Sequence, residues 1–549
     1  MKQSPSANNL SAFFTLITVF FFWGFVAASN GIFIPFCKAH FHLDQFDSQL
    51  IDASFYGAYF FGSLILFLFS SLTKVDLLNK IGYKNGIIYG LLLSVVGALS
   101  LAYISGSGNA TFPMVLVSFF IIALGFSLQQ TAAQPFVVLL GDNASGAHRL
   151  NMAGGVNSFG TLLGPIIVSL VLFGSLNNES TNADISNIKT LYLIMAGLFT
   201  LIAIFFAVSK LPAFISDEKM EKSPKAIIAL LIIAVPTFFL IFLNKIVEAA
   251  GSSGKLYLIA ATLVITMAVL FYALAASAKN KEGWGAMAYP QLVLGMIAIF
   301  VYVGVEVTIQ SNMGALLKQP GFLTTDGLNT KFISPFIALY WGSLMIGRWS
   351  GAVSVFNLKT TTKKALMILM PFIAFAVILV ANYLRGSDIN NLLPYVICIC
   401  VLVAVTLFSK ENPVTMLFSF SAIAAVALLI GMITSGWVAT YAIISGGLFC
   451  SVMWPCIFSL AIAGLGKYTS QGSAFMIMMI LGGAIIPPLQ GVICDFDKTS
   501  TSLIMGDTYT HFSYIVPVIC FAYLAWHALK TKNVLQKQNI LFDKKVSNH

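Results

Sequence analysis

Apolar segments of roughly 20 residues recur along the whole chain, and no other feature limits its possible folds as strongly. A helix of about this length crosses about 30 Å of hydrocarbon. The composition agrees, because 58% of the 549 residues are hydrophobic and only 9% are charged, against about 25% charged in a typical soluble domain. A soluble fold cannot bury so much apolar surface, and the segments lack the alternation of barrel strands. We therefore expect membrane-spanning helices.

We predict sixteen spans in an all-α polytopic membrane protein. Their expected bounds are 12–36, 50–72, 87–105, 113–139, 152–173, 190–209, 226–243, 256–277, 289–310, 332–353, 365–383, 392–408, 413–430, 437–460, 473–493 and 512–529. The first span exceeds the apolar core of a cleaved signal peptide, which is about 7–15 residues long. We therefore expect it to be retained as a helix.

Basic residues indicate which ends of the spans face the cytoplasm. With the N-terminus inside, 22 of the 30 Lys and Arg residues fall on the cytoplasmic side. They are Lys74, Lys80, Lys84, Arg149, Lys210, Lys219, Lys222, Lys225, Lys279, Lys281, Arg348, Lys359, Lys363, Lys364, Lys410, Lys467 and the six lysines near the termini. A chance distribution would be nearly even, so we expect both termini to be cytoplasmic. The net charge of +10 then follows from topology, and no nucleic-acid partner is implied.

The seven cysteines lie mostly within apolar spans or at their ends. No pair has the spacing of a metal site or of a redox CxxC motif. We expect no metal centre and no cofactor.

Two parts of the chain show the same order of features. Pro135 and Pro455 each lie in an apolar segment that is followed by a short basic loop and then by a glycine-rich segment containing proline. Aromatic, glycine-containing segments around Tyr56 and Tyr340 form another pair. The prolines are further apart than the tyrosines, which suits a helical hairpin inserted into the second part. The alternative is that Gly and Pro are simply common in membrane helices.

The repeat predicts two six-helix halves, the parallel-repeat plan of the major facilitator fold, with about four extra helices. The expected divisions are 11–209 for the N-terminal half, 210–284 for a cytoplasmic linker with an inserted hairpin, 285–530 for the C-terminal half with a second hairpin at about 365–408, and 531–549 for a cytoplasmic tail.

Glu306 is the one carboxylate that we place well inside a span. An ionisable group at the bilayer centre costs at least about 2.5–3.5 kcal/mol, so it usually faces a cavity or a partner. Gln310 follows one helical turn later on the same face. A protonated or paired Glu306 could instead fasten two helices together, but we favour a functional role.

Amide side chains form a second polar group within the spans. Gln130 and Gln134 share one helix face, where Pro135 removes a backbone donor. Asn157 lies among glycines, and Asn30 interrupts the first span. A single amide can simply hold two helices together, but the set indicates a shared cavity. Amides beside aromatic rings suit the hydroxyls and the apolar ring face of a sugar.

Several motifs give the chain a family resemblance. They are Phe20-Phe21-Phe22-Trp23-Gly24-Phe25, Phe55-Tyr56-Gly57-Ala58-Tyr59-Phe60, Gln130-Thr131-Ala132-Ala133-Gln134-Pro135-Phe136, Arg149-Leu150-Asn151, Asn157-Ser158-Phe159-Gly160, Tyr302-Val303-Gly304-Val305-Glu306, Ile346-Gly347-Arg348 and Pro455-Cys456-Ile457-Phe458-Ser459-Leu460. In this order, and outside the two proposed insertions, the chain resembles the fucose–proton symporter and glucose/galactose transporter family of the major facilitator superfamily. The resemblance implies alternating-access transport of a hexose.

The chain departs from that family at charged positions. Gly31 and Gln130 stand where the fucose–proton symporter has its proton and sugar carboxylates, so coupling through that pair is not expected. Glu306 stands where that symporter has an amide, and Trp454 stands where it has Tyr. The resemblance assigns to the central cavity Gln130, Gln134, Asn157, Glu306 and Trp454.

We therefore expect a cation-coupled symporter of glucose, galactose, fucose or a similar hexose. Glu306 is the expected ion-coupling residue, and the expected substrate-binding residues are Asn30, Gln130, Gln134, Asn157, Gln310 and Trp454. The expected coupling ion is either sodium, bound near Glu306, or a proton. Sodium is favoured because no second carboxylate remains that could pass a proton to or from Glu306. We expect a monomer in the bacterial inner membrane.

Three alternatives remain open at this level. They are an uncoupled sugar facilitator, a sugar sensor that does not transport, and a membrane-embedded transferase. A transferase would need a histidine or paired-carboxylate constellation, and only His40 and His42 lie close together in the sequence.

Overall fold

The computed structural model describes residues 9–42, 45–107, 109–141, 145–173, 185–213, 221–242, 252–319, 321–322, 330–356, 358–498 and 508–540. Along residues 29–36, and in a few other short stretches, only the backbone is described. The predicted site residue Asn30 therefore lies outside the described side chains.

Within these ranges every regular element is a helix, which confirms the all-α prediction. The longer helices are α1 (Asn9–His40), α2 (Gln45–Thr73), α4 (Tyr83–Gly106), α5 (Phe112–Leu139), α6 (Gly146–Phe173), α7 (Ile185–Val208), α8 (Pro224–Phe242), α10 (Ser252–Lys279), α11 (Pro290–Leu317), α12 (Thr330–Ala352), α13 (Thr360–Leu384), α14 (Val396–Phe408), α15 (Pro413–Ile433), α16 (Gly436–Cys450), α17 (Met453–Ala461), α18 (Thr469–Met478), α19 (Gly482–Asp495) and α21 (Ile515–Lys537). The short helices α3 (Leu77–Ile81) and α20 (Tyr509–Phe512) precede α4 and α21.

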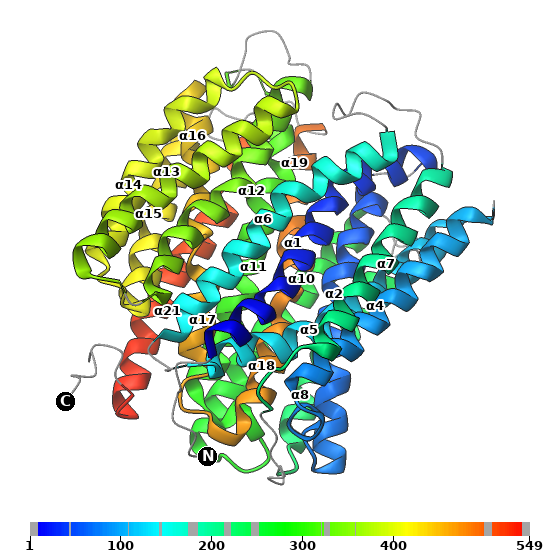
Figure 1. Cartoon of the computed structure of the whole chain (residues 1–549), viewed down its shortest axis with the longest axis vertical. Coiled ribbons are helices and arrows are strands. Elements are labelled where there is room, and N and C mark those ends of the chain that lie inside the picture. The colour runs from blue at the N-terminus through cyan, green and yellow to red at the C-terminus, as the bar shows by residue number, and fades with distance from the viewer. Residues whose placement is uncertain are drawn as a thin grey trace.

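Fourteen of the described helical segments are long and apolar enough to cross a membrane. The other two predicted spans correspond to α6 and α12, which are helical over 28 and 23 residues and lie at the centre of the molecule (Figure 1). Each of the sixteen predicted segments overlaps one or two of these helices.

The helices form two bundles with matching internal packing (Figure 1). In the first, α4 packs on α5 and α7, α1 packs on α6, and α2 packs on α5. In the second, α15 packs on α16 and α21, α11 packs on α19, and α12 packs on α16. Helices α8 and α10, and helices α13 and α14, fall outside this recurring pattern. The pattern favours the divisions at 11–209 and 285–530 with two added hairpins, which remain a prediction.

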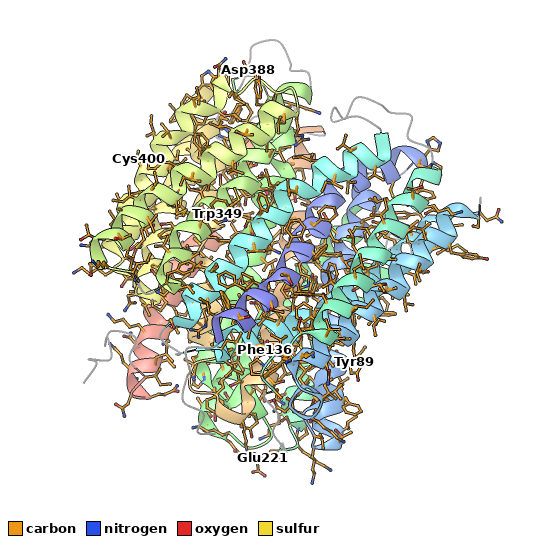
Figure 2. All side chains as sticks on the ribbon, viewed as in Figure 1. Tyr89, Phe136, Glu221, Trp349, Asp388 and Cys400 are labelled. Carbon is orange, nitrogen blue, oxygen red and sulfur yellow. The ribbon has the colours of Figure 1, made fainter. Side chains whose placement is uncertain are left out.

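The surface of the molecule suits a bilayer. Glu221 and Asp388 lie at opposite ends, whereas Tyr89 and Cys400 are exposed on the flanks between them (Figure 2). Helix α1 begins and α21 ends at the same end of the molecule (Figure 1). We call this the terminal end; it is the end that the basic residues predict to be cytoplasmic.

Within each bundle, a glycine lets two helices approach closely, and the two helix pairs correspond to each other. A Cβ atom at Gly160 would lie 2.1 Å from the backbone oxygen of Phe21, across the α1–α6 contact. A Cβ atom at Gly482 would lie 1.8 Å from the backbone oxygen of Phe300, across the α11–α19 contact. Membrane helices associate through close van der Waals packing, which small residues permit. These two contacts fix the helices that flank the centre of the molecule.

An ion pair and a neighbouring histidine link the α13–α14 hairpin to the first bundle. Lys363 of α13 places Nζ 2.6 Å from Oε2 of Glu411, in the loop before α15, and His148 at the start of α6 places Nε2 3.7 Å from the same oxygen. Burial lowers the pKa of His148 below its usual value. Burial would raise the pKa of Glu411, but the hydrogen bond and charge of Lys363 outweigh it, so this pKa lies below its usual value.

We expect acid to destabilise the protein through His148. The pKa of His148 is lower in the folded state than in the unfolded chain, so the unfolded chain binds a proton first as the pH falls through about 6.5. The free energy of unfolding then falls by up to about 1.4 kcal/mol for each pH unit that separates the two pKa values. His148→Gln should reduce the loss of melting temperature between about pH 7.5 and 5.5, measured on detergent-solubilised protein. The exposed His40 provides the matched control, His40→Gln. Equal pH dependence in wild type and His148→Gln would contradict the prediction.

Candidate functional site

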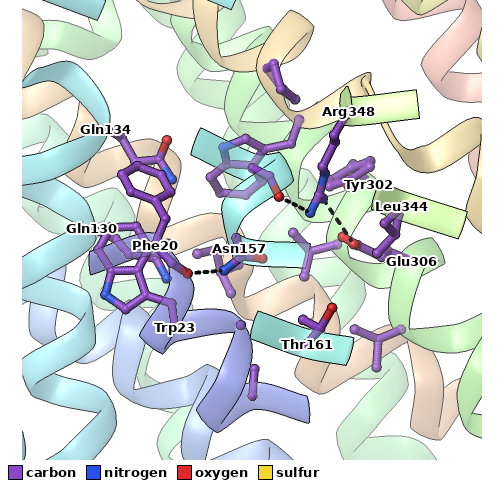
Figure 3. Close-up of a pocket in the computed structure, with 18 of the residues that line it drawn as sticks. Phe20, Trp23, Gln130, Gln134, Asn157, Thr161, Tyr302, Glu306, Leu344 and Arg348 are labelled. Atoms are coloured by element: carbon purple, nitrogen blue, oxygen red, sulfur yellow. Dashed lines mark hydrogen bonds and ion pairs between the residues drawn. The ribbon is translucent and has the colours of Figure 1, made fainter. Parts of the chain in front are cut away.

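A cavity of about 170 Å³ lies between the two bundles (Figure 3). A single water needs only about 10–15 Å³ by the same measure, so the cavity is large enough for a small molecule. Helices α1, α2, α5 and α6 line it on one side, and α11, α12 and α17 line it on the other. Its polar side chains are Tyr56, Tyr59, Gln130, Gln134, Asn157, Thr161, Glu306 and Arg348; its aromatic walls include Phe20, Trp23, Phe55, Tyr302, Trp341 and Trp454.

Three amides reach the cavity from the first bundle. Gln130 Nε2 donates to the hydroxyl of Tyr59 at 3.1 Å, and Asn157 Nδ2 donates to the backbone oxygen of Phe20 at 2.9 Å (Figure 3). The Oε1 atom of Gln134 is buried and has no hydrogen-bond partner among the described residues. A buried acceptor without a partner costs roughly 1–3 kcal/mol, so this oxygen is available to a ligand.

The second bundle contributes an indole at a break in a helix. The predicted span 437–460 is two helices here, because α16 ends at Cys450 and α17 begins at Met453. Pro455 lacks the N–H that would bond to the carbonyl oxygen of Ser451 in a continuous helix. Trp454 follows the break and stacks on Phe458. Its buried Nε1 donor has no hydrogen-bond partner among the described residues.

Glu306 and Arg348 form an ion pair in the cavity wall (Figure 3). Arg348 Nη2 lies 3.6 Å from Glu306 Oε1, and both side chains are largely buried. The hydroxyl of Tyr340 donates to the backbone oxygen of Glu306 at 2.6 Å, which fixes this turn of α11. The charge at this level of the bilayer is therefore compensated inside the protein.

The structure brings most of the predicted site residues together. Gln130, Gln134, Asn157, Glu306 and Trp454 line the same cavity. Gln310 is not among the lining residues. It follows Glu306 on one face of α11, but one turn displaces it by about 6 Å along the helix axis. Binding roles for these residues remain predictions.

Our prediction of a cytoplasmic position for Arg348 is wrong. We expected it on the cytoplasmic side near the end of span 332–353, but α12 continues to Ala352 and Arg348 is 8% exposed at the cavity. The available signal was its place inside an apolar segment, where a charge usually has a partner. Tyr59, Tyr302 and Trp341 were also missed as lining residues, because aromatic residues are frequent throughout the chain.

The two bundles also touch at the terminal end of the cavity. Pro135 leaves the carbonyl oxygen of Thr131 without its helical donor, and the hydroxyl of Ser473, from α18 of the other bundle, donates to it at 3.2 Å. The hydroxyl of Ser470 donates to Asp76 Oδ1 at 3.0 Å in the same region. These contacts hold the two bundles together on the side of the terminal end.

Comparisons with known proteins agree with this architecture. No family model matches the chain. The glucose/galactose transporter of Brucella abortus is 29% identical over 529 residues, which cover 96% of each chain. The L-fucose-proton symporter of Escherichia coli is 24% identical over 534 residues, covering 94% of this chain and 92% of the symporter. The solved structure of the major facilitator superfamily transporter FucP, in the outward conformation, covers 95% of this chain and 99% of its own with a TM-score of 0.61 and 22% identity.

The chain therefore has the fold of the major facilitator transporter FucP, as the repeat predicted. The resemblance found in its motifs is confirmed by relatives of both predicted names. Both relatives are named as transporters, in line with our expectation that this chain is a transporter and not an enzyme.

Proposed function

We propose that the protein is a symporter that carries a hexose-type sugar by alternating access. One observation carries the proposal: an unpaired acceptor, Gln134 Oε1, and an unpaired donor, Trp454 Nε1, line one cavity from opposite bundles. A sugar hydroxyl both donates and accepts, so one ligand satisfies both atoms. Because the two atoms belong to different bundles, ligand binding also links the halves that must move.

The walls of the cavity support a sugar over a charged or purely apolar ligand. Trp23, Trp341 and Trp454 present flat aromatic surfaces, against which the apolar face of a pyranose ring packs. The only charges on the described lining are those of Glu306 and Arg348, which compensate each other. The names of the relatives, glucose/galactose transporter and L-fucose-proton symporter, are consistent with this assignment.

Glu306 is the coupling residue in this proposal. Arg348 lies 3.6 Å from its carboxylate, and a fixed positive charge at this distance repels a sodium ion. A proton needs no further ligands and neutralises the carboxylate directly. We therefore favour a proton over the sodium ion that the sequence suggested, in line with the relatives that are named proton symporters.

We propose a monomer in the bacterial inner membrane with both termini cytoplasmic. Both bundles of this chain supply residues to the cavity, and α1 begins at the same end where α21 ends. The excess of basic residues predicts that this terminal end is cytoplasmic.

Counterflow of labelled hexoses in proteoliposomes tests the proposal, because only a carrier exchanges internal for external sugar. We expect Gln134→Ala and Trp454→Phe each to raise the sugar concentration that gives half-maximal exchange by about 5- to 150-fold, which corresponds to a loss of roughly 1–3 kcal/mol in binding free energy. Gln310→Ala is the matched control, because Gln310 lies outside the cavity lining. Exchange of no hexose by the wild-type protein would identify a sensor or another class of protein. Unchanged half-saturation in both cavity variants would place the sugar elsewhere.

A further inference from the structure

Arg348 contacts three parts of the molecule at once. Its Nη2 atom lies 3.6 Å from Glu306 Oε1 on α11. Its Nη1 atom donates to Ser158 Oγ at 2.7 Å and lies 3.3 Å from the backbone oxygen of Gly154, both on α6 of the opposite bundle. Its Nε atom donates to the backbone oxygen of Ser451 at 3.1 Å. The side chain is buried, so these contacts are made away from bulk water.

The contact with Ser451 connects Arg348 to the broken helix. The oxygen of Ser451 has no helical donor because Pro455 has no N–H, and Arg348 supplies the missing hydrogen bond. Trp454 lies between these two residues, where its unpaired indole lines the cavity. Arg348 therefore positions the segment that carries Trp454.

Helix α6 is shaped to receive this part of α12. A Cβ atom at Gly154 would lie 3.1 Å from Arg348 Cδ, and one at Gly155 would lie 2.8 Å from Trp349 Cδ1. Trp349 lies between the two bundles in Figure 2, with its Nε1 donating to the Gly155 oxygen at 3.4 Å. Two adjacent glycines thus admit an arginine and a tryptophan from the other bundle.

We propose that Arg348 is the positioning residue that links the charge on Glu306 to the closed contact between α6 and α12. The inference rests on the proposed symport function. While Glu306 is ionised, its charge compensates the buried guanidinium that binds α6. When a coupling cation neutralises Glu306, the guanidinium is left buried without a counter-charge, which is strongly unfavourable. The contact with α6 then weakens, and the cavity opens toward the terminal end.

No other described side chain on the cavity lining carries a charge that could replace either partner. The other titratable groups that interact with Glu306 are the phenols of Tyr56, Tyr302 and Tyr340 and the thiol of Cys450. A buried phenol or thiol is neutral at physiological pH, because burial disfavours its charged form. Arg348 is therefore the one charged partner of Glu306 among the described lining residues.

A double-mutant cycle on the conformational equilibrium tests this proposal. Spin labels are introduced as unnatural amino acids at two exposed residues, Asn85 of α4 in the first bundle and Lys364 of α13, which packs on α12 of the second bundle. Pulsed electron resonance then gives the fractions of closed and open protein in lipid nanodiscs. We expect Glu306→Gln to lower the closed-to-open ratio by about tenfold or more in the wild-type background. We expect no further change when the same substitution is made in Arg348→Gln.

Additive effects of the two substitutions would overturn the proposal, because Glu306 would then act through another route. Arg385→Gln is the matched control, since Arg385 lies outside the cavity lining, and it should leave the ratio unchanged. If Arg348→Gln does not yield folded protein, Arg348→Met replaces it in the cycle, because methionine also removes the charge and keeps a long, unbranched side chain. Counterflow by the wild-type protein is measured separately. Absence of hexose exchange would contradict the proposed function, whereas additive effects in the cycle would contradict only the role of Arg348.

Discussion

Glu306→Gln is expected to abolish uphill sugar accumulation. A membrane potential of about 100 mV is worth about 2.3 kcal/mol per charge carried, or roughly fiftyfold accumulation, and the variant should only equilibrate sugar across the membrane. The physical reason is that glutamine cannot take up or release a charge, while its shape preserves the cavity wall. Accumulation is measured in proteoliposomes with an imposed pH gradient and membrane potential.

Counterflow separates this loss of coupling from a loss of binding. Exchange requires no net release of the coupling ion, so Glu306→Gln should still exchange labelled hexose, although at a different rate. Glu306→Asp is the matched control, because it keeps the carboxylate and should retain part of the accumulation. A Glu306→Gln protein that still concentrates sugar would show that the carboxylate only holds helices together. Repeating the measurement with a sodium gradient at fixed pH identifies the ion.

Gly160→Val is expected to prevent stable folding. The added Cβ would lie 2.1 Å from the backbone oxygen of Phe21, and the neighbouring Gly24 has a similar contact, 2.0 Å from the backbone oxygen of Asn157. Backbone atoms cannot rotate away as side chains do, so α1 and α6 must separate. Overpacking typically costs about 1–3 kcal/mol and occasionally more, and a clash with backbone atoms is expected at the upper end.

Yield of monodisperse protein and its melting temperature in detergent measure this effect. Gly197→Ala on α7 is the matched control, because a Cβ atom there would meet nothing within 4 Å. Alanine has the higher helix propensity, by about 1 kcal/mol, so the control should be neutral or stabilising. A Gly160→Val protein as stable as wild type would mean that the α1–α6 contact is looser than the structure has it.

Local pattern was enough to predict the class of protein and its helices. A span must satisfy its own backbone hydrogen bonds in lipid, so its existence depends on about 20 consecutive residues and not on distant partners. For the same reason Glu306 stood out within Val303–Val307 before any contact was known. The break between α16 and α17 was not predicted, although Pro455 lies within the predicted span 437–460. Many membrane helices contain a proline without breaking, so this residue alone did not indicate a break.

Which polar side chains meet depended on tertiary packing. The tilt and rotation of a membrane helix are set by its neighbours, here by close contacts such as that at Gly160. The sequence could place Glu306 and Gln310 on one face but not decide that only Glu306 lines the cavity. The sequence also could not decide whether Arg348 lies on the cytoplasmic side or pairs with Glu306 inside the protein.

The sequence by itself determined a polytopic helical protein with a carboxylate and several amides inside its spans, because hydropathy and helical periodicity are properties of short segments. Only the tertiary structure decided that Gln134 and Trp454 offer an unpaired acceptor and an unpaired donor to one cavity, and that Arg348 reaches from α12 to α6. Arg348 and Ser158 are 190 positions apart, so their hydrogen bond depends on how the two bundles pack against each other. That packing involves surfaces formed by several helices, which no single segment of the sequence contains.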